Sequence, residues 1–257
     1  DSDRIWVAGT GSLFGTDSNR GVYRSLDGGE SWENMGLRDT RSIHRIAIHP
    51  TNPDIVFVAA PGHRWGPNEE RGLFRTRNGG LTWEKVLYVN ETTGCADVDL
   101  DPQEPSIVYA AMWQFRRSPD FFESGGPGSG LYRTLDGGKS WENITPRELP
   151  KWSLISMIEL STFDPATAYL AVDRHELDDF RPYIYKTVKV GNTIKTTNGT
   201  WSVAGLTYTY QWKRNGVAIN RNIQNYVQPI WIIGRRQDRC SWPCPRKPSM
   251  SPHRQSQ

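Results

Sequence analysis

One eight-residue motif occurs three times in this chain of 257 residues. Each copy reads Ser/Thr-x-Asp/Asn-Gly-Gly-x-Ser/Thr-Trp, and each directly follows a Gly-aliphatic-aromatic-Arg segment. The copies occupy residues 25–32, 76–83 and 134–141, so they begin 51 and 58 residues apart. A period near 50 residues that contains only short strands and turns is typical of a β-propeller, in which each repeat forms one blade.

The residues of the motif have a structural explanation. An Asp or Asn side chain accepts hydrogen bonds from the backbone of its own turn, and the glycines supply positive φ angles. The indole ring of the closing Trp is expected to be largely buried under the hairpin. Asn78 in the middle copy argues against a role that needs charge, so the motif predicts no metal site. The residues with this expected structural role are Asp27, Trp32, Asn78, Trp83, Asp136 and Trp141.

The motif resembles the Asp-box of bacterial neuraminidase repeats. Such boxes occur in sialidases, in propeller enzymes that cleave xyloglucan and in sortilin-type receptors. The stretch between boxes at residues 46–57 resembles the secreted sortilin-like proteins of bacteria. The resemblance covers residues 1–187 and implies a secreted or cell-surface β-propeller. It does not imply one activity, because proteins of unrelated function carry the same boxes.

Apolar alternation around the boxes predicts 14 strands and an all-β fold. Two repeats contain four strands each, the first repeat lacks its first strand, and the last repeat ends after its third strand at Thr187. Since a propeller usually closes with 4–8 four-stranded blades, we expect a partial, open propeller of about three and a half blades. The expected strands are residues 5–8, 21–25, 31–35, 43–48, 55–60, 72–76, 82–88, 96–100, 107–112, 130–134, 140–144, 155–160, 168–172 and 183–187.

The character of the sequence changes near residue 188. A fourth box would place Asp and Trp where Lys189 and Ile194 stand. Residues 188–227 instead resemble an incomplete bacterial immunoglobulin-like repeat, with Trp212 as a core residue and Asn215-Gly216 as a hairpin turn. Residues 228–257 are rich in Arg, Pro and Ser, which predicts a disordered or frameshifted tail. We therefore expect three parts, namely residues 1–187, 188–227 and 228–257.

Composition narrows the classes of function. A net charge of +3 does not suggest nucleic-acid binding. The sequence has no apolar run of 18 residues, so no membrane-spanning helix is expected. Three Cys form no metal pattern, and no phosphate-binding loop occurs, so no metal and no cofactor are expected. Because the chain starts without a signal peptide, an export signal is expected to lie outside it.

The long loops supply the candidate binding residues. In an antiparallel meander, successive connections alternate between two ends of the sheet, so the box turns share one face and the long loops gather on the other. Aromatic rings beside charged groups suit glycan or peptide recognition, although the charges are also able to pair with one another and only hold the loops still. The candidates are His63, Arg64, Trp65, Trp113, Arg116, Arg117, Arg174 and His175.

Catalysis finds weaker support in the sequence. Glycoside hydrolysis needs two facing carboxyl groups, and the candidates are Asp97, at the start of a strand near the long loops, and Asp173. A solvated strand end is the favoured interpretation of Asp97. We therefore expect an extracellular module that recognises a glycan, protein or peptide without catalysis. A fragment of a xyloglucanase-like or sialidase-like hydrolase is the alternative, and a structural surface module is the third hypothesis. Open blade edges also predict self-association.

Overall fold

The computed structural model describes residues 3–10, 20–161, 167–181, 183–190, 193–198, 213–214 and 217–218. The chain divides into two compact units, Asp1–Ser202 and Val203–Gln257. The described part of the second unit is one antiparallel pair, β17 (Lys213–Arg214) with β18 (Val217–Ala218). Most of the expected immunoglobulin-like segment, residues 188–227, and all of the tail, residues 228–257, lie outside the described residues, so these expectations stay predictions.

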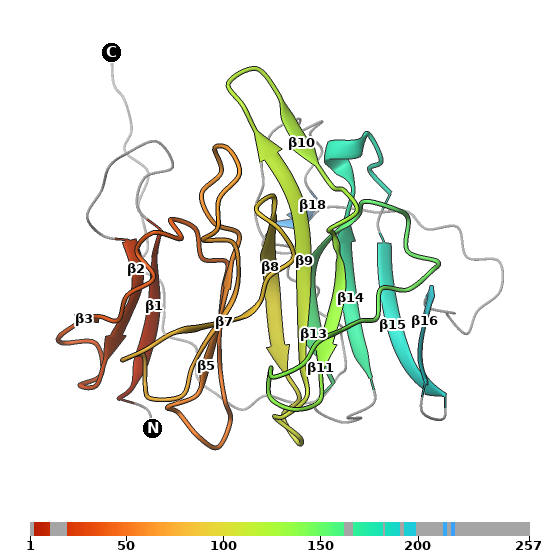
Figure 1. Ribbon diagram of the computed structural model, residues 1–257. Helices are drawn as coiled ribbons and strands as arrows, with labels where there is room; N and C mark the ends of the chain where they lie inside the picture. The colour runs from red at the N-terminus through yellow and green to blue at the C-terminus, as the bar shows by residue number, and fades with distance from the viewer. Residues whose placement is uncertain are drawn as a thin grey trace, which may run out of the picture. The chain divides into compact units, whose positions relative to one another are not determined.

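The first unit consists of four successive antiparallel sheets (Figure 1). They contain β1–β3, β4–β7, β8–β12 and β13–β16, and the one described helical segment is the short 3-10 helix η1 (His175–Leu177). This confirms the predicted all-β propeller-type fold. The strands are β1 (Ile5–Thr10), β2 (Arg20–Ser25), β3 (Glu33–Asn34), β4 (Arg45–Ile48), β5 (Val56–Ala60), β6 (Gly72–Thr76), β7 (Glu84–Leu87), β8 (Thr93–Leu100), β9 (Val108–Arg117), β10 (Phe122–Ser124), β11 (Gly130–Thr134), β12 (Glu142–Asn143), β13 (Leu154–Leu160), β14 (Ala168–Asp173), β15 (Tyr183–Val190) and β16 (Thr193–Asn198).

Two strands were not expected from the sequence. β16 pairs with β15 and completes a fourth sheet that was expected to end at its third strand. In the sequence Gly191-Asn192 separates two runs rich in Thr, Val and Ile, a pattern that favours a hairpin without any box. β10 pairs with the extended end of β9 inside the loop expected at residues 113–129. The first compact unit thus continues past the boundary expected at residue 187.

Separate apolar cores join neighbouring sheets. Val22 of the first sheet packs with Val56 and Val58 of the second. Phe57 and Leu73 of the second sheet pack with strands β8 and β9 of the third. The third core brings the third and fourth sheets together, and its largest members are Tyr109, Leu131, Leu149, Ile155, Ile158, Leu170 and Tyr185. Each sheet is therefore stabilised mainly by its neighbours in the chain, as expected for a repeat architecture.

The box turns have the predicted hydrogen bonds. In the first, Asp27 Oδ1 accepts from the Ser31 N–H at 2.9 Å and from the Ser25 hydroxyl at 2.7 Å. Asn78 accepts the equivalent bonds in the second turn, and Asp136 in the third. The prediction that these three side chains bond within their own turns is confirmed.

The prediction that the three box Trp side chains are largely buried is wrong. Trp32 is 43% exposed, and Trp83 and Trp141 are half-buried. Trp83 packs on the preceding sheet, where its Nε1 donates to the Met35 carbonyl at 2.6 Å. No described sheet precedes Trp32, whose Nε1 donates to Gly29 of its own turn. The ring thus buries its surface against the neighbouring sheet rather than under its own hairpin.

The Arg before each of the first two boxes links neighbouring sheets. Arg24 Nη1 donates to the Gly79 carbonyl at 2.6 Å, and Arg75 Nη1 donates to the Gly137 carbonyl. Each acceptor belongs to the box turn of the following sheet. Arg24 also pairs with Glu33, and Arg75 pairs with Glu84, both within their own sheets. Arg133, before the third box, makes the equivalent pair with Glu142 within its own sheet.

Candidate functional site

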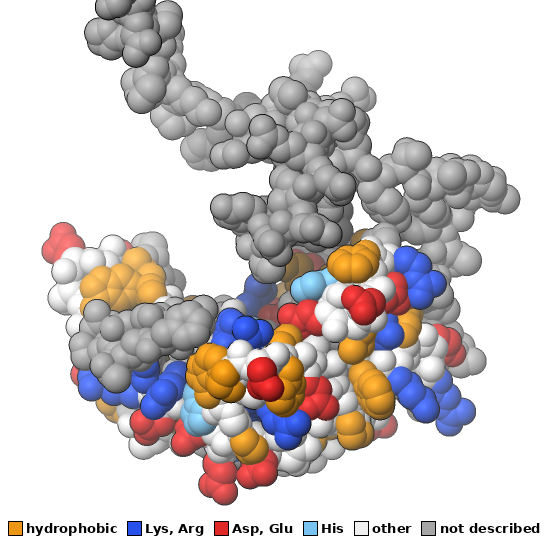
Figure 2. All heavy atoms as spheres, turned by 90° about the horizontal axis from the view of Figure 1, so that it is seen from above, with side chains coloured by type: hydrophobic (Ala, Val, Ile, Leu, Met, Phe, Trp, Pro, Cys, Tyr) orange, Lys and Arg blue, Asp and Glu red, His pale blue; other side chains and the backbone are white. Residues whose placement is uncertain are grey.

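Three connections meet on the face opposite the box turns, and we call this the long-loop face. They are residues 61–71, 113–129 and 173–181, and the last two form the β9–β10 hairpin and the η1 loop at the top of Figure 1. Trp65 forms an isolated β-bridge with Arg117, which joins the first two connections. Glu176 accepts a hydrogen bond from Ser124, which joins the last two. Figure 2 views the molecule from this side, where hydrophobic, basic and acidic side chains lie next to one another.

Arg71 holds the first connection against β9. Its side chain is fully buried, and its guanidinium lies 4.0 Å from the centre of the Phe115 ring. Nη1 donates to the carbonyls of Thr92 and Phe115, at 3.0 and 3.2 Å. Burial lowers the pKa of Arg71 to about 10, so it stays charged at neutral pH. Arg71 therefore positions the loop and does not face a ligand.

An aromatic cluster supports the β9–β10 hairpin. Trp113 and Phe115 are two residues apart in β9, so their side chains lie on the same face of the strand. Their rings stack with centres 4.2 Å apart. Phe122 of β10 meets Trp113 edge-on at 6.0 Å. The Trp113 Nε1 donates to the Ser124 hydroxyl at 3.1 Å. Trp113, a predicted ligand contact, is thus half-buried in a cluster that holds the hairpin rigid.

Two other rings on this face are open to solvent. Trp65 is 38% exposed and Phe121 is 42% exposed. The Arg116 guanidinium lies 5.3 Å from the Phe121 ring, and that of Arg117 lies 5.5 Å from the Phe122 ring. Arg116 and Arg117 are both exposed. These side chains form a surface on which an aromatic ring is available beside a cation.

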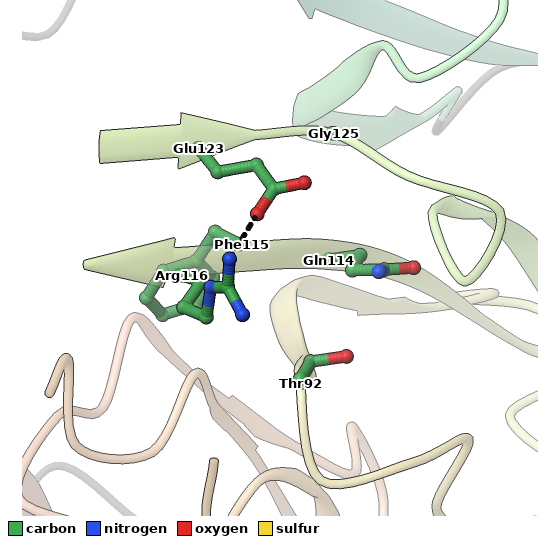
Figure 3. Close-up of a pocket in the computed structure, with 6 residues that line it drawn as sticks. All are labelled: Thr92, Gln114, Phe115, Arg116, Glu123 and Gly125. Atoms are coloured by element: carbon green, nitrogen blue, oxygen red, sulfur yellow. Dashed lines mark ion pairs between the residues drawn. The ribbon is translucent and has the colours of Figure 1, made fainter. Parts of the chain in front are cut away.

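A half-open pocket of about 190 Å³ lies between β9, β10 and the start of β8 (Figure 3). Arg116 and Glu123 form an ion pair at its edge, with 3.4 Å between Nη2 and Oε2. Gln114 Oε1 accepts the Gly128 N–H at 2.8 Å. Ligand pockets usually exceed about 300 Å³, so this one fits a single small polar group. Its lining residues are Thr92, Gln114, Phe115, Arg116, Glu123 and Gly125.

The remaining predicted residues of the 61–71 connection make local contacts. His63 lies with its Nδ1 2.9 Å from the Trp65 carbonyl and its Nε2 3.6 Å from Glu70. Arg64 is exposed beside it. The sequence interpretation that some charges only hold loops still therefore applies to His63.

The η1 loop carries a cluster of charged side chains. Asp173 Oδ1 accepts the His175 N–H at 3.0 Å and lies 2.7 Å from the His175 Nδ1. Asp173 thus orders the start of η1, and it faces His175 rather than a second carboxyl group. Arg174 pairs with Asp179 at 3.2 Å and donates to the Lys151 carbonyl at 2.7 Å. Both Arg174 and Asp173 therefore have structural contacts.

Glu176 has the properties of a general acid. Burial raises its pKa, and the hydrogen bond from Ser124 and the charges of His175 and Arg64 oppose that rise. A carboxyl group with a raised pKa is a candidate proton donor. The sequence did not single out Glu176, because its contact with Ser124 depends on β10, whose existence the loop sequence did not indicate.

Asp97 lies in the boundary between two sheets. It is 4% exposed, and its Oδ2 accepts the N–H of Ile158 in β13 at 2.7 Å. Asp99 Oδ2 accepts the N–H of Leu160 at 3.0 Å. The interpretation of Asp97 as a solvated strand end is therefore wrong. Its carboxylate is engaged in joining β8 to β13.

Within the described part of the chain, no three His, Cys, Asp or Glu side chains are arranged to hold a metal ion. No helix there has the length and apolar character required to cross a membrane.

Comparison with known proteins identifies the family. The family model Sortilin-Vps10, described as "Sortilin, neurotensin receptor 3", matches residues 20–153, which is more than half of the chain. The chain belongs to the Sortilin-Vps10 family. The matched region of this Sortilin-Vps10 chain contains all three boxes and the β9–β10 hairpin.

Curated relatives of this Sortilin-Vps10 chain include two xyloglucanases. A Paenibacillus xyloglucanase is 24% identical over 168 residues, and covers 56% of this chain and 15% of its own length. Xyloglucanase Xgh74A of Acetivibrio thermocellus is 27% identical over 164 residues, and the match covers 56% of this chain and 18% of the xyloglucanase. The chain thus spans less than a fifth of the length of these relatives.

Solved structures show the same fold. An ancestral GH74 enzyme superposes with a TM-score of 0.54 at 20% identity, over 76% of this chain and 24% of the enzyme. The GH74 xyloglucanase of Xanthomonas campestris superposes with a TM-score of 0.50 at 18% identity, over 72% of this chain and 27% of the enzyme. The GH74 enzyme of Niastella koreensis superposes with a TM-score of 0.50 at 22% sequence identity, and the coverage of the two chains is again 72% and 27%. At these identities the likeness concerns the fold alone.

Proposed function

We propose that this chain is a segment of a secreted propeller protein of the glycoside hydrolase type, and that its long-loop face binds xyloglucan. The relatives named xyloglucanases support the substrate class. The observation that carries the proposal is the pair of exposed rings, Trp65 and Phe121, beside the Arg116–Glu123 ion pair.

The chemistry of this surface fits a neutral polysaccharide. A sugar ring presents an apolar C–H face that packs on an aromatic ring, while its hydroxyl groups bind charged and polar side chains. Because Glu123 pairs with Arg116 at the pocket, part of the positive charge there is neutralised. A glucan without charge is therefore a better fit than an acidic ligand.

Cleavage makes a further demand on the protein. A glycosidase needs two carboxyl groups about 5–9.5 Å apart across the scissile bond. Asp97 and Asp99 are engaged by main-chain N–H groups of β13, which leaves Glu176 as the best acid among the described residues. In this proposal the described residues bind the glucan, and cleavage needs a second carboxyl group. Recognition of a glycan or protein without catalysis is the second candidate, and the engagement of Asp97 and Asp99 favours it.

Affinity electrophoresis in gels that contain soluble xyloglucan tests the binding. We expect Trp65→Ala and Phe121→Ala to remove most of the retardation. The matched controls are Leu81→Ala and Leu135→Ala, which alter exposed apolar side chains in the box turns, and they should migrate like the unmodified chain. Equal loss in both pairs, or no retardation of the unmodified chain, contradicts the proposal.

Release of reducing sugar from xyloglucan separates the two candidates. Hydrolysis that Glu176→Gln removes, while retardation in the gel persists, supports the enzyme. Retardation without any hydrolysis means that this chain binds xyloglucan but does not itself supply both carboxyl groups needed for cleavage.

A further inference from the structure

Trp152 has an unusual backbone conformation. It lies in the connection between β12 and β13, with a φ of 65°. This left-handed region is disfavoured for residues with a Cβ atom, so glycine is its usual occupant. The Trp152 side chain is also 56% exposed, so burial does little to offset the strain. A strained, bulky and exposed residue points to a function outside the fold itself.

Contacts from two other connections hold this turn in place. Arg174 Nη1 donates to the Lys151 carbonyl at 2.7 Å and to the Ser153 hydroxyl at 3.0 Å. The Ser153 hydroxyl donates to the Pro150 carbonyl at 2.6 Å. The main chain of Trp152 packs directly on Gly125, where an added Cβ would lie 2.1 Å from the Trp152 carbonyl oxygen. The ring is therefore presented from a fixed backbone while remaining open to solvent.

The position of Trp152 relative to the pocket suggests what it binds. Gly125 packs against Trp152 and also lines the pocket of Figure 3. The other polar residues of that pocket are Thr92, Gln114, Arg116 and Glu123. The main chain of Trp152 thus shares the neighbour Gly125 with a small site that offers hydroxyl, amide, cationic and carboxylate groups. Stacking on a ring together with hydrogen bonds at the rim is how a pyranose is held.

We propose that Trp152 is a stacking platform for one pyranose unit of a β-glucan, and that the adjacent unit places its hydroxyl groups in the pocket. This rests on the glucan binding proposed above and names one residue that carries it. The clamp by Arg174 and the fit against Gly125 mean that little freedom of the turn is lost on binding. Such preorganisation lowers the entropic cost of binding a ligand.

The test compares Trp152→Gly, Trp152→Phe and the control Leu81→Ala by isothermal titration with a xyloglucan oligosaccharide. An aromatic stacking contact corresponds to a change in affinity of about three- to ten-fold, so Trp152→Gly should bind that much more weakly. Trp152→Phe should retain most of the affinity, and Leu81→Ala should bind like the unmodified chain. The melting temperature of Trp152→Gly should not fall, because glycine relieves the strain at this φ. A purely structural residue would lower the melting temperature and leave affinity unchanged.

A second measurement uses the unmodified chain and so does not depend on how a variant folds. Oxidation by N-bromosuccinimide, read by peptide mass spectrometry, should be slower at Trp152 when the oligosaccharide is present. Unchanged oxidation of Trp152, or full affinity in Trp152→Gly while Trp65→Ala and Phe121→Ala bind weakly, overturns the role of Trp152 and leaves the proposed function standing. No binding by the unmodified chain overturns both.

Discussion

The carboxylate of Asp97 accepts a hydrogen bond from the main-chain N–H of Ile158 at 2.7 Å, across the boundary between β8 and β13. Asp99 repeats this contact two residues further along with Leu160. Side chains of one sheet therefore satisfy main-chain donors of the next. This places an ionisable group where a repeat protein is most sensitive, at the interface between repeats.

Asp97 should make stability depend on pH. Burial is the main cause that raises its pKa from 3.8 to about 6, so the folded chain holds a proton more tightly than the unfolded chain. The stability contributed by this group is present below about pH 4 and is lost as pH rises to about 6. A shift of about two units corresponds to roughly 3 kcal/mol. Urea unfolding at pH 4, 5, 6 and 7 measures this. The free energy of unfolding should change less with pH in Asp97→Asn than in the unmodified chain, whereas the exposed control Asp39→Asn should keep the original pH dependence. An unchanged slope in Asp97→Asn contradicts this assignment.

The middle box turn depends on the amide of Asn78. Its Oδ1 accepts from the Thr82 N–H at 3.0 Å and from the Thr76 hydroxyl at 2.9 Å. Asn78→Ala leaves both donors without this acceptor and should lower the free energy of unfolding by about 1–2 kcal/mol. Asn78→Asp restores the residue of the other two turns and should be close to neutral at pH 7. Chemical denaturation measures both, with Leu81→Ala as the control in the same turn. Equal stability of Asn78→Ala and Leu81→Ala argues against the role.

The outer two turns should respond to acid. The side-chain hydroxyl of Ser140 is the largest contributor that holds the pKa of Asp136 below its usual range, and Ser31 does the same for Asp27. A carboxyl group whose pKa is lowered by folding stabilises the folded chain at pH values above its pKa in the unfolded chain. This stabilisation is lost as the pH falls below about 4. We therefore expect Asp136→Asn to reduce the loss of stability between pH 4 and pH 2. Thermal melting across this range checks the sign, and a steeper acid loss in Asp136→Asn disproves it.

Arg75 should be important for the contact between the second and third sheets. It is 3% exposed, donates to the Gly137 carbonyl and pairs with Glu84 at 2.7 Å. Hydrogen bonds from a charged group contribute about 1.5–3 kcal/mol, so Arg75→Met should destabilise by about that amount. Arg77→Met, two residues away and exposed, is the matched control. Similar denaturation midpoints for the two variants rule out the link.

Charged residues on the two faces should contribute differently to glucan binding. Arg116→Ala and Arg117→Ala should weaken it, because both guanidinium groups lie over rings of the long-loop face. Glu30→Ala and Lys139→Ala, in box turns, should leave it unchanged. Titration with xyloglucan measures the effect, and equal weakening in both pairs rejects the assignment of faces.

Trp32 should promote self-association. Trp83 and Trp141 each contribute to a core between sheets, whereas Trp32 is 43% exposed and Val7 in the same sheet is 44% exposed. An apolar sheet face of this kind favours association with a second chain. Light scattering should show a lower mean mass for Trp32→Glu than for Leu135→Glu. The same mass for both variants excludes Trp32 as the contact.

Local signals predicted the fold well. The boxes and the Gly-aliphatic-aromatic-Arg segments each act over a few residues, so most strands lie within a few residues of their expected places. The sequence analysis did not predict β16, because no box follows β15 and Lys189 stands where the Asp of a fourth box would be. Strand pairing there needs only a two-residue turn and β-branched neighbours.

The site was predicted less well, because its properties come from contacts between sheets. Asp97 looked like an open strand end until Ile158 of the next sheet was placed beside it. Trp152 has no local motif, and its interest lies in a φ of 65° that no pattern of residues indicates. The sequence predicts Arg174 as a ligand-binding cation, but its guanidinium donates to the Lys151 carbonyl and the Ser153 hydroxyl beside Trp152. Sequence patterns identify elements, and partners from distant elements decide roles.

The forward reach of Arg24 and Arg75 changes what counts as one repeat. Each Arg binds a carbonyl in the box turn of the following sheet, so donor and acceptor lie on opposite sides of the first two boundaries between sheets. A chimera that exchanges the whole second sheet between related proteins therefore separates both pairs, one at each side. An exchange that begins before Arg24 and ends after the box turn at residues 76–83 would keep Arg24 with Gly79 and divide only the Arg75–Gly137 pair, and chain recombination in this family should favour those junctions.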